Sequence, residues 1–349
     1  HVRAGKVPFP DIPRFAAIEQ AAERIRGLAQ VTPVFRSTSI DQLAGAALLF
    51  KCENLQRAGA FKFRGACNAV WSLPQAMASR GVVTHSSGNH GAALALAART
   101  RGIPAHVVIP DGAVQSKIDA IEAYGATLHR CAPTLAAREQ TAEAVRGQTG
   151  ATLVHPYTDP AVIAGQGTAA LEFLGQVPAL DALIAPVGGG GLISGTAIAA
   201  AAMAPSLRVL AAEPAGAADT WTSLQRGERV ASFEPDTICD GLRALVGTIN
   251  LHIIRQHRVQ VLTVSDDATI SAMRLVWQRL KLLVEPSAAT VLAAVLANRD
   301  QFAGQRIGLI LSGGNVDLDK LPWTATGARD WIKENQSNAP ARPARASGR

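Results

Sequence analysis

Lys62 is the residue best suited to covalent chemistry. It stands between Phe61 and Phe63, in a segment (residues 59–66) that also contains several small side chains. Apolar neighbours remove water from an ammonium group, which lowers its pKa and makes the amine a better nucleophile. The segment therefore indicates a reactive lysine, although the motif alone is also typical of an ordinary lysine at the start of a helix.

Two loops have the composition of anion-binding sites. Residues 86–91 read Ser-Ser-Gly-Asn-His-Gly, and residues 188–191 are four consecutive glycines. Each loop lies between an expected strand and an expected helix, where free backbone N–H groups bind anions. A close helix–strand contact needs one or two glycines, so a run of four favours an anion such as phosphate. The serine loop, taken alone, is also consistent with a simple helix cap.

A third loop follows the strand pattern at 306–311 and begins with Ser312. Ligands of open α/β sheets collect at the carboxyl ends of the strands. The Ser312 hydroxyl is therefore in a position to meet a ring nitrogen of a ligand. A plain surface loop is the alternative interpretation.

The elements that must position these loops alternate along the chain. We expect strands separated by helices at this spacing to form right-handed βαβ units and parallel sheets. The first series has strand patterns at 81–85, 105–109, 126–131 and 152–155, with helices at 92–99, 115–124 and 135–145. The second series has strands at 182–187, 208–212, 259–264 and 306–311, with a helix at 192–202.

The composition excludes several classes of function. The formal net charge is +7, but the basic residues are scattered and do not form a stripe interleaved with aromatics, so we expect no nucleic-acid partner. No apolar run reaches the roughly 18–20 residues that span a bilayer, and the first residues do not resemble a secretory signal. The four cysteines form no C-x-x-C pair, so buried reduced thiols in the cytoplasm are expected.

Together these segments resemble the fold type II enzymes that use pyridoxal 5'-phosphate (PLP), and among them the serine racemases and serine/threonine dehydratases, which are ammonia-lyases. The resemblance runs from about residue 18 to residue 316. It is carried by residues 53–56, 61–66, 86–91, 164–168, 188–191, 282–286 and 312–317.

The resemblance implies a two-domain α/β fold of the tryptophan synthase β type, with parallel sheets flanked by helices. A large PLP-binding domain would comprise residues 1–72 and 156–330. A small domain, residues 73–155, would be inserted into it, with PLP in the cleft between them. The Ala-, Pro- and Arg-rich tail, residues 331–349, is expected to be disordered.

The resemblance also implies cofactor roles. Lys62 would carry PLP covalently and would move the Cα proton of the substrate. The other matching positions are Phe61 beside the ring, Asn89 at the ring hydroxyl, Gly188, Gly189, Gly190 and Gly191 at the phosphate, and Ser312 at the pyridine nitrogen. A neutral serine leaves that nitrogen largely unprotonated, which suits elimination and proton exchange better than transamination.

Other matching residues would bind the substrate. Its carboxylate would lie at Ser86, Ser87, Asn89 and His90, and Ser87 matches the acid that serves the second face in serine racemases. Arg138 matches a racemase arginine that reaches toward the substrate. Tyr157 and Ala244 stand where those enzymes carry Asn and Ser. These two changes favour a side chain larger than that of serine, as in 3-phenylserine or 3-hydroxyaspartate. Glu285 would lie near the ring, or would simply precede Pro286 at a helix start.

A metal site is also implied by the resemblance. Its ligands would be Glu213, the backbone carbonyl of Ala217, and Asp219. Two carboxylates and a carbonyl are hard oxygen ligands that suit Mg²⁺ or Ca²⁺. A solvated loop is the alternative.

We therefore expect a PLP-dependent lyase that converts a 3-hydroxy amino acid to a 2-oxo acid and ammonia, as a cytoplasmic homodimer. Amino-acid racemisation is the nearest alternative. A nicotinamide dehydrogenase is a different class: Glu213 follows the glycine run by about 20 residues, as a ribose-binding acid does, but a third glycine at the fingerprint spacing is missing. A non-catalytic sensor would not need Lys62 and Ser312.

Overall fold

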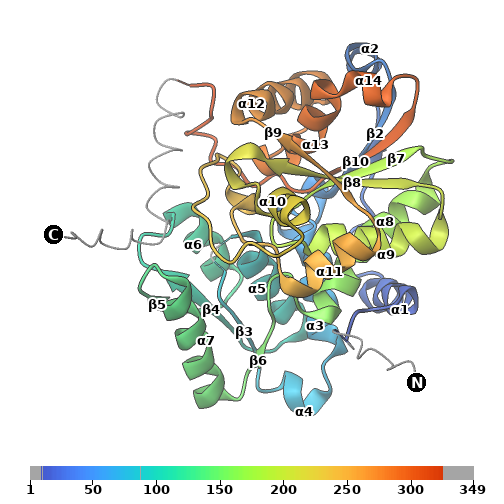
Figure 1. Cartoon of the computed structure of the whole chain (residues 1–349). Helices are drawn as coiled ribbons and strands as arrows, with labels where there is room; N and C mark the ends of the chain where they lie inside the picture. The colour runs from blue at the N-terminus through green and yellow to red at the C-terminus, as the bar shows by residue number, and fades with distance from the viewer. Residues whose placement is uncertain (1–8, 10, 87, 325–349) are drawn as a thin grey trace.

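The computed structural model describes residues 9, 11–86 and 88–324, and it consists of two sheets with helices packed on their faces (Figure 1). The larger sheet has the order β1-β2-β10-β7-β8-β9, and all its neighbours are parallel except β1 and β2. Its strands are β1 (Val34–Phe35), β2 (Ala47–Cys52), β7 (Ala182–Pro186), β8 (Arg208–Pro214), β9 (Gln260–Val264) and β10 (Arg306–Leu311). The expected parallel α/β architecture is confirmed.

The smaller sheet is parallel throughout, with the order β5-β4-β3-β6, and lies below the larger sheet in Figure 1. Its strands are β3 (Val82–Thr84), β4 (Ala105–Pro110), β5 (Thr127–Cys131) and β6 (Thr152–Leu153). The helices α5 (Asn89–Arg101), α6 (Gln115–Ala123) and α7 (Leu135–Thr149) connect these strands. The structure begins α5 three residues before the expected helix at 92–99, because Gly88 is the N-cap residue and the helix already includes Asn89.

Two apolar cores cover the faces of the larger sheet. One face is covered by α1 (Phe15–Ile25), α8 (Pro160–Gln176), α9 (Gly191–Met203) and α11 (Thr248–Gln256). The other is covered by α2 (Thr38–Ala44), α12 (Asp266–Leu275) and α13 (Pro286–Ala297). The strand β7 is buried at every position, as expected for a strand covered on both faces.

The remaining elements are short or lie between the two sheets. The helix α3 (Lys62–Ser72) packs against α5 and α8, so it belongs to the cores of both parts of the molecule. The others are α4 (Gln75–Ala78), α10 (Asp219–Arg226), α14 (Arg299–Phe302), the 3₁₀ turns η1 (Glu53–Leu55), η2 (Arg57–Gly59), η3 (Ala215–Ala217) and η4 (Asp240–Leu242), and the π-helical turn η5 (Val276–Leu280).

Glycines allow α3, α8 and α9 to lie unusually close together. A β-carbon on Gly165 of α8 would lie 2.6 Å from the Cα atom of Gly65 in α3. A β-carbon on Gly195 of α9 would lie 2.4 Å from the backbone nitrogen of Gly167 in α8. These contacts leave no room for a side chain, which accounts for part of the high glycine content of the chain.

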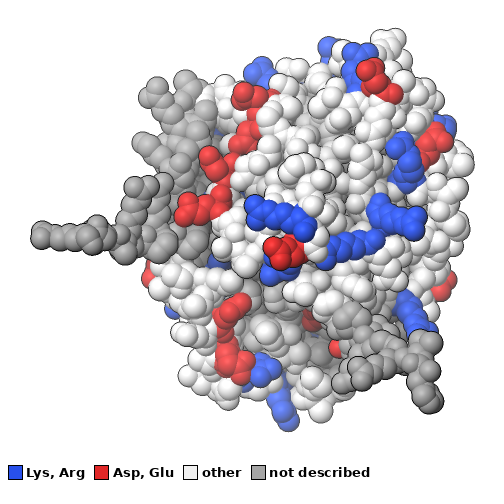
Figure 2. Space-filling view, viewed as in Figure 1, with Lys and Arg blue, Asp and Glu red and all other residues white. Residues whose placement is uncertain are grey.

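The charged residues, the cysteines and the helix lengths agree with the expectations from composition. On the described part of the face in Figure 2, basic and acidic side chains occur in small groups with uncharged surface between them. The four cysteines are free and buried, as expected from their spacing. No helix within residues 9, 11–86 and 88–324 is long and apolar enough to cross a bilayer.

Candidate active site

The segment before Lys62 pairs with the loop after β10, although about 250 positions separate them in the sequence. The Phe61 N–H donates to the Ser312 carbonyl at 3.0 Å, and the Gly314 N–H donates to the Gly59 carbonyl at 2.9 Å. Between them, Ala60 and Gly313 form an isolated antiparallel bridge. The segment that leads into Lys62 and the loop that begins with Ser312 are therefore bonded to each other, and Ser312 is buried.

Lys62 is the first residue of α3, and its half-buried side chain points to the chain that follows the smaller sheet. Its Nζ atom donates to the Pro156 carbonyl at 3.1 Å and lies 5.2 Å from the centre of the Phe61 ring. Burial lowers the pKa of the Lys62 ammonium to about 8, and the charge of Glu285 opposes this shift. A fraction of the amine is thus neutral near physiological pH, as a nucleophile or base requires.

Asn89 and Glu285 connect the smaller sheet to the larger one. The Asn89 Nδ2 atom donates to both Glu285 oxygens, at 3.0 and 3.2 Å. The Asn315 N–H donates to the same carboxylate at 3.0 Å. Burial raises the pKa of Glu285 to about 7, and the negative charge of Asp240 adds to this rise. Asn315 was not singled out as a functional residue from the sequence.

The four glycines form a cradle at the start of α9. A β-carbon on Gly189 would lie 2.2 Å from the Tyr157 ring, and one on Gly188 would lie 3.0 Å from the Cα atom of Leu242. Gly190 has φ +101° and is the N-cap residue of α9. The backbone N–H groups at the start of α9 have no intrahelical partner and no side chain of residues 188–191 beside them, which suits an anion such as phosphate.

Tyr157 lies against this cradle, and the ring of His155 contacts its ring edge-on with centroids 4.7 Å apart. The His155 Nδ1 atom accepts hydrogen bonds from the Tyr157 and Thr158 N–H groups, at 3.3 and 3.1 Å, so its proton is on Nε2. Burial lowers the pKa of His155 to about 4, with smaller contributions from His85 and Lys62. One wall of the site is therefore made of neutral rings.

Arg138 on α7 brings a positive charge toward this wall. Its Nε atom is buried and has no hydrogen-bond partner in the described part of the chain. Burial lowers the pKa of the neighbouring His85, and the charge of Arg138 contributes to the same shift. The rings of His85 and His155 are 5.6 Å apart, so these groups occupy one region of the site.

The other expected substrate residues are distributed as follows. His90 is buried, and its Nε2 atom lies 3.2 Å from the Val154 carbonyl. Ser86 is half-buried, and its hydroxyl accepts from the Gly88 N–H at 3.4 Å. Ala244 is half-buried in the loop between η4 and α11. Ser87 lies outside the described residues.

Glu213 and Asp219 form a buried carboxylate pair beyond the cradle. The Glu213 oxygens accept from the Thr220 and Trp221 N–H groups at 2.9 Å, and an Asp219 oxygen accepts from the Val246 N–H at 2.7 Å. Burial raises the pKa of both carboxyl groups, and the charge of Asp219 adds to the rise at Glu213. The described residues contain no cluster of three or more His, Cys, Asp or Glu side chains with metal-ligand geometry.

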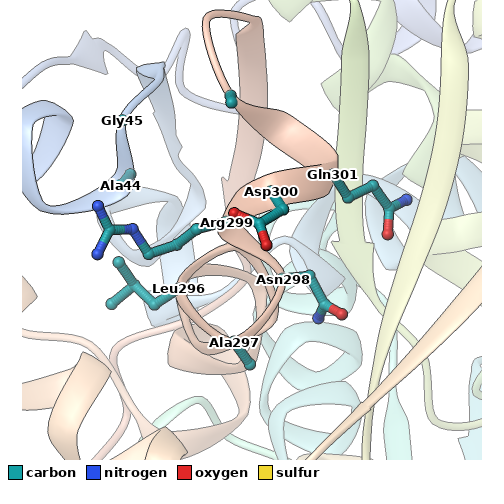
Figure 3. A pocket seen from close by; sticks show the side chains of 9 residues that line it. Ala44, Gly45, Leu296, Ala297, Asn298, Arg299, Asp300 and Gln301 are labelled. Atoms are coloured by element: carbon teal, nitrogen blue, oxygen red, sulfur yellow. The ribbon is translucent and has the colours of Figure 1, made fainter.

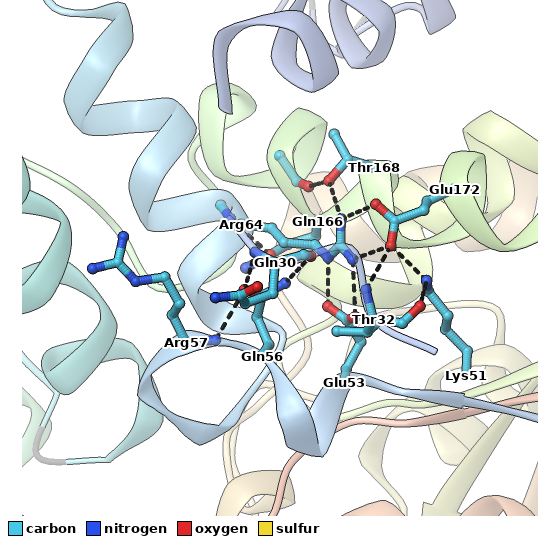
Figure 4. A network of polar contacts seen from close by, with 12 residues as sticks. Gln30, Thr32, Lys51, Glu53, Gln56, Arg57, Arg64, Gln166, Thr168 and Glu172 are labelled. Atoms are coloured by element: carbon cyan, nitrogen blue, oxygen red, sulfur yellow. Dashed lines mark hydrogen bonds and ion pairs between the residues drawn. The ribbon is translucent and has the colours of Figure 1, made fainter. Parts of the chain in front are cut away.

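An ionic network that the sequence analysis did not find lies beneath α3 (Figure 4). The Arg64 Nη2 atom donates to Glu53 and to Glu172, both at 2.9 Å. Lys51 bonds to the same Glu172 and to the Thr32 carbonyl. Lys51, Glu53 and Arg64 are almost fully buried. A lysine inside the apolar strand 47–52 was the sequence signal that could have indicated this network.

A surface hollow lies away from this site. It has a volume of about 620 Å³ and is lined by Ala44, Gly45 and residues 296–301 and 303 (Figure 3). These residues lie at the end of α2 and α13 and in α14, just before β2 and β10, so the hollow is at the amino edge of the larger sheet. The residues described above converge at the carboxyl ends of β3, β7 and β10, where ligands of such sheets bind.

Known proteins are similar to this chain over most of its length. A family model described as "Pyridoxal-phosphate dependent enzyme" matches residues 25–313. The chain is 47% identical to a beta-hydroxyaspartate dehydratase of Paracoccus denitrificans (strain Pd 1222), over 89% of this chain and 99% of that protein. It is 48% identical to a serine racemase of Dictyostelium discoideum, over 87% and 95%. The solved structure of maize serine racemase superposes with a TM-score of 0.86 at 46% identity, over 88% and 95%.

Proposed function

This chain belongs to the family of pyridoxal-phosphate dependent enzymes, and from that premise we propose that it is a dehydratase which removes water from 3-hydroxyaspartate. The observation that carries the choice of substrate is Arg138, whose buried Nε has no acceptor among the described residues. A buried N–H without an acceptor is costly, so the site favours a ligand that brings an anion to it. A second substrate carboxylate is such an anion, and it can pair with a guanidinium in a bidentate manner.

The residues present fit PLP. The glycine cradle at Gly188–Gly191 would hold the phosphate, because its backbone N–H groups at the start of α9 have no side chains of their own beside them. Ser312 would face the ring nitrogen, Asn89 the ring hydroxyl, and Phe61 the side of the ring. When bound, PLP supplies an electron sink for the electron pair at the substrate Cα atom.

Lys62 would perform the proton transfers. Its Nζ atom would take the Cα proton of the bound substrate. A pKa of about 8 lets the amine act as a base near neutral pH and return the proton later. The substrate α-carboxylate would be bound by Ser86, Ser87, Asn89 and His90. Loss of the 3-hydroxyl group together with a proton, as water, would give an enamine that hydrolyses to a 2-oxo acid and ammonia.

The alternative substrate 3-phenylserine is less favoured. Tyr157, on which an aryl group was expected to stack, already packs against the glycine cradle and His155. The space beside Ala244 is the remaining argument for an aryl group. Racemisation remains a second candidate activity because of the similarity to serine racemases, with Ser87 as the acid on the face opposite Lys62.

We also propose that Glu213, Asp219 and the Ala217 carbonyl bind Mg²⁺ or Ca²⁺. Burial disfavours the ionised form of both carboxyl groups, and a divalent cation would compensate the cost of burying their charges. The cation would connect the end of β8 to the start of α10. The division into a large domain (1–72 and 156–330) and a small domain (73–155), the homodimer and the cytoplasmic location belong to the same proposal.

A substrate screen tests the proposed function. The purified protein is incubated with PLP and with 3-hydroxyaspartate, 3-phenylserine, L-threonine or L-serine, and the 2-oxo acid and ammonia are measured. We expect the highest kcat/KM for 3-hydroxyaspartate and no turnover or covalent cofactor absorbance in Lys62→Ala. A highest kcat/KM for L-serine would overturn the substrate assignment.

A further inference from the structure

Three amide and carboxylate groups form a continuous chain of hydrogen bonds across the site. The Asn315 Nδ2 atom donates to the Ala58 carbonyl at 2.8 Å and to the Asn89 Oδ1 atom at 2.9 Å. The Asn89 Nδ2 atom in turn donates to Glu285. This series of hydrogen bonds thus runs from the segment before Lys62, through the loop after β10, to the first turn of α5.

The direction of these bonds is determined by the Ala58 carbonyl. A carbonyl only accepts, so the Asn315 group facing it is the NH₂ group, and both N–H bonds of that group are used. If the Asn315 amide were flipped, its oxygen would face two acceptors. The Asn89 oxygen is therefore fixed toward Asn315, and the Asn89 NH₂ group is fixed on the side of Glu285.

An amide NH₂ group has two N–H bonds. Because the two oxygens of one carboxylate lie side by side, a single N–H bond of Asn89 can point between both Glu285 oxygens. The second N–H bond of Asn89 remains for another acceptor. In the proposed function this acceptor is the ring hydroxyl oxygen of PLP.

We propose that Asn315 is a positioning residue that fixes the Asn89 amide as a hydrogen-bond donor to the cofactor. This proposal rests on the proposed function, since it needs PLP in the site. Asn315 itself is exposed, and its side chain donates only to Ala58 and Asn89 among the described residues, so its role would be indirect.

The backbone around Asn315 is built to hold this geometry. Ala58 has φ +57°, and the following Gly59 has φ +74°, so the Ala58 carbonyl is turned by two successive left-handed residues. Left-handed geometry is unfavourable for alanine and is retained where the surroundings impose it. A β-carbon on Gly59 would lie 2.3 Å from the Asn315 Oδ1 atom, so only glycine leaves space for the Asn315 side chain.

The variant Asn315→Asp tests the proposal, because a carboxylate of the same shape can only accept. It would draw the NH₂ group of Asn89 toward itself and turn the Asn89 oxygen toward the cofactor. The apoprotein is titrated with PLP while absorbance is recorded. We expect a dissociation constant for PLP about tenfold higher and a change in the visible band of the bound cofactor. In Asn315→Ala a water molecule can partly replace the lost amide donor, so the same changes should occur but be smaller.

A double-mutant cycle separates positioning from the added charge. If Asn315 acts through Asn89, then Asn315→Asp in an Asn89→Ala background causes no further change in PLP affinity or in the band. The matched control is Asn298→Asp, because the Asn298 Nδ2 atom donates to the Ala294 carbonyl at the end of α13. That variant should match the wild type. If Asn315→Asp does not fold, Asn315→Ala and its cycle with Asn89→Ala are used instead.

The proposal is overturned if the Asn315 variants bind PLP with wild-type affinity and an unchanged band, even when their melting temperatures fall. It is also overturned if the effects of the Asn315 and Asn89 variants are additive. A failure of the proposed function looks different, because the wild type would then show no visible band with PLP or no turnover.

Discussion

Arg64 and Glu53 form an ion pair in the protein interior, with their Nη2 and Oε2 atoms 2.9 Å apart. Arg64 lies two residues after Lys62 in the first turn of α3, and Glu53 begins the turn that follows β2. The pair therefore fixes the start of α3 relative to the larger sheet. Glu172 of α8 joins the pair and balances the charge of Lys51.

We expect Glu53→Gln to destabilise the protein by about 3–5 kcal/mol, because it leaves the buried guanidinium of Arg64 with one charged partner. Chemical denaturation measures this change. The control is Glu143→Gln, which removes an exposed ion pair with Arg146 and should cost less than about 1 kcal/mol. Equal stability of the two variants would show that the interior pair does not fix α3.

Arg138→Ala should reduce kcat/KM for 3-hydroxyaspartate roughly 30-fold or more. This factor corresponds to a loss of about 2–5 kcal/mol of binding free energy. L-serine has no second carboxylate, so its turnover should change little. Arg146→Ala is the matched control, since Arg146 is on the same helix but pairs with Glu143 at the surface. A similar loss for both substrates would mean that Arg138 has a general structural role.

The stability of the cofactor-free protein should depend on pH through Lys62. Burial lowers its pKa from 10.5 to about 8 in the folded state. Between these values the unfolded chain binds more protons, so the unfolding free energy rises as the pH rises from about 8 toward 10.5. We expect Lys62→Met to lose this part of the pH dependence, measured as the difference between the two proteins in denaturant titrations. If the unfolding free energies of the two proteins changed with pH in parallel, the lowered pKa of Lys62 would be contradicted.

Removal of divalent cations should lower the melting temperature, because a cation bound only to the folded state stabilises it. Mg²⁺ or Ca²⁺ should restore it after EDTA. Asp219→Asn should give the low melting temperature without EDTA, whereas Asp300→Asn at the distant surface hollow should respond like the wild type. An unchanged melting temperature with EDTA would refute the metal site.

The sequence was most informative where local patterns decide the structure. The apolar run and the glycines predicted a strand at 182–187 and a helix at 192–202, and the structure has β7 at Ala182–Pro186 and α9 at Gly191–Met203. β7 is buried at every position and α9 is buried from Gly191 to Ala200, so their composition is nearly continuous in apolar and small residues.

Membership of the PLP-dependent enzymes also leaves the nicotinamide dehydrogenase alternative without support.

The contacts across the site could not be predicted in this way. The Asn315–Asn89 bond joins residues 226 positions apart, and Lys51 contacts Glu172 across 121 positions. Neither contact produces a periodic signal in the sequence, because each depends on where two separate elements meet in the fold. Asn89 was assigned to the cofactor from the resemblance, but the neighbours that orient it became visible only in the structure.

The contacts between glycines of α8 and α9 have a consequence for inherited or engineered variation. An added methyl group at Gly195 would push α9 away from α8, and α9 begins at the glycine cradle. A substitution at Gly195 in the core would thus lower the affinity of the glycine cradle for a phosphate, although Gly195 is not part of the cradle. Because bound cofactor stabilises the folded state by mass action, cells carrying such a variant should regain activity when their supply of vitamin B6 is increased.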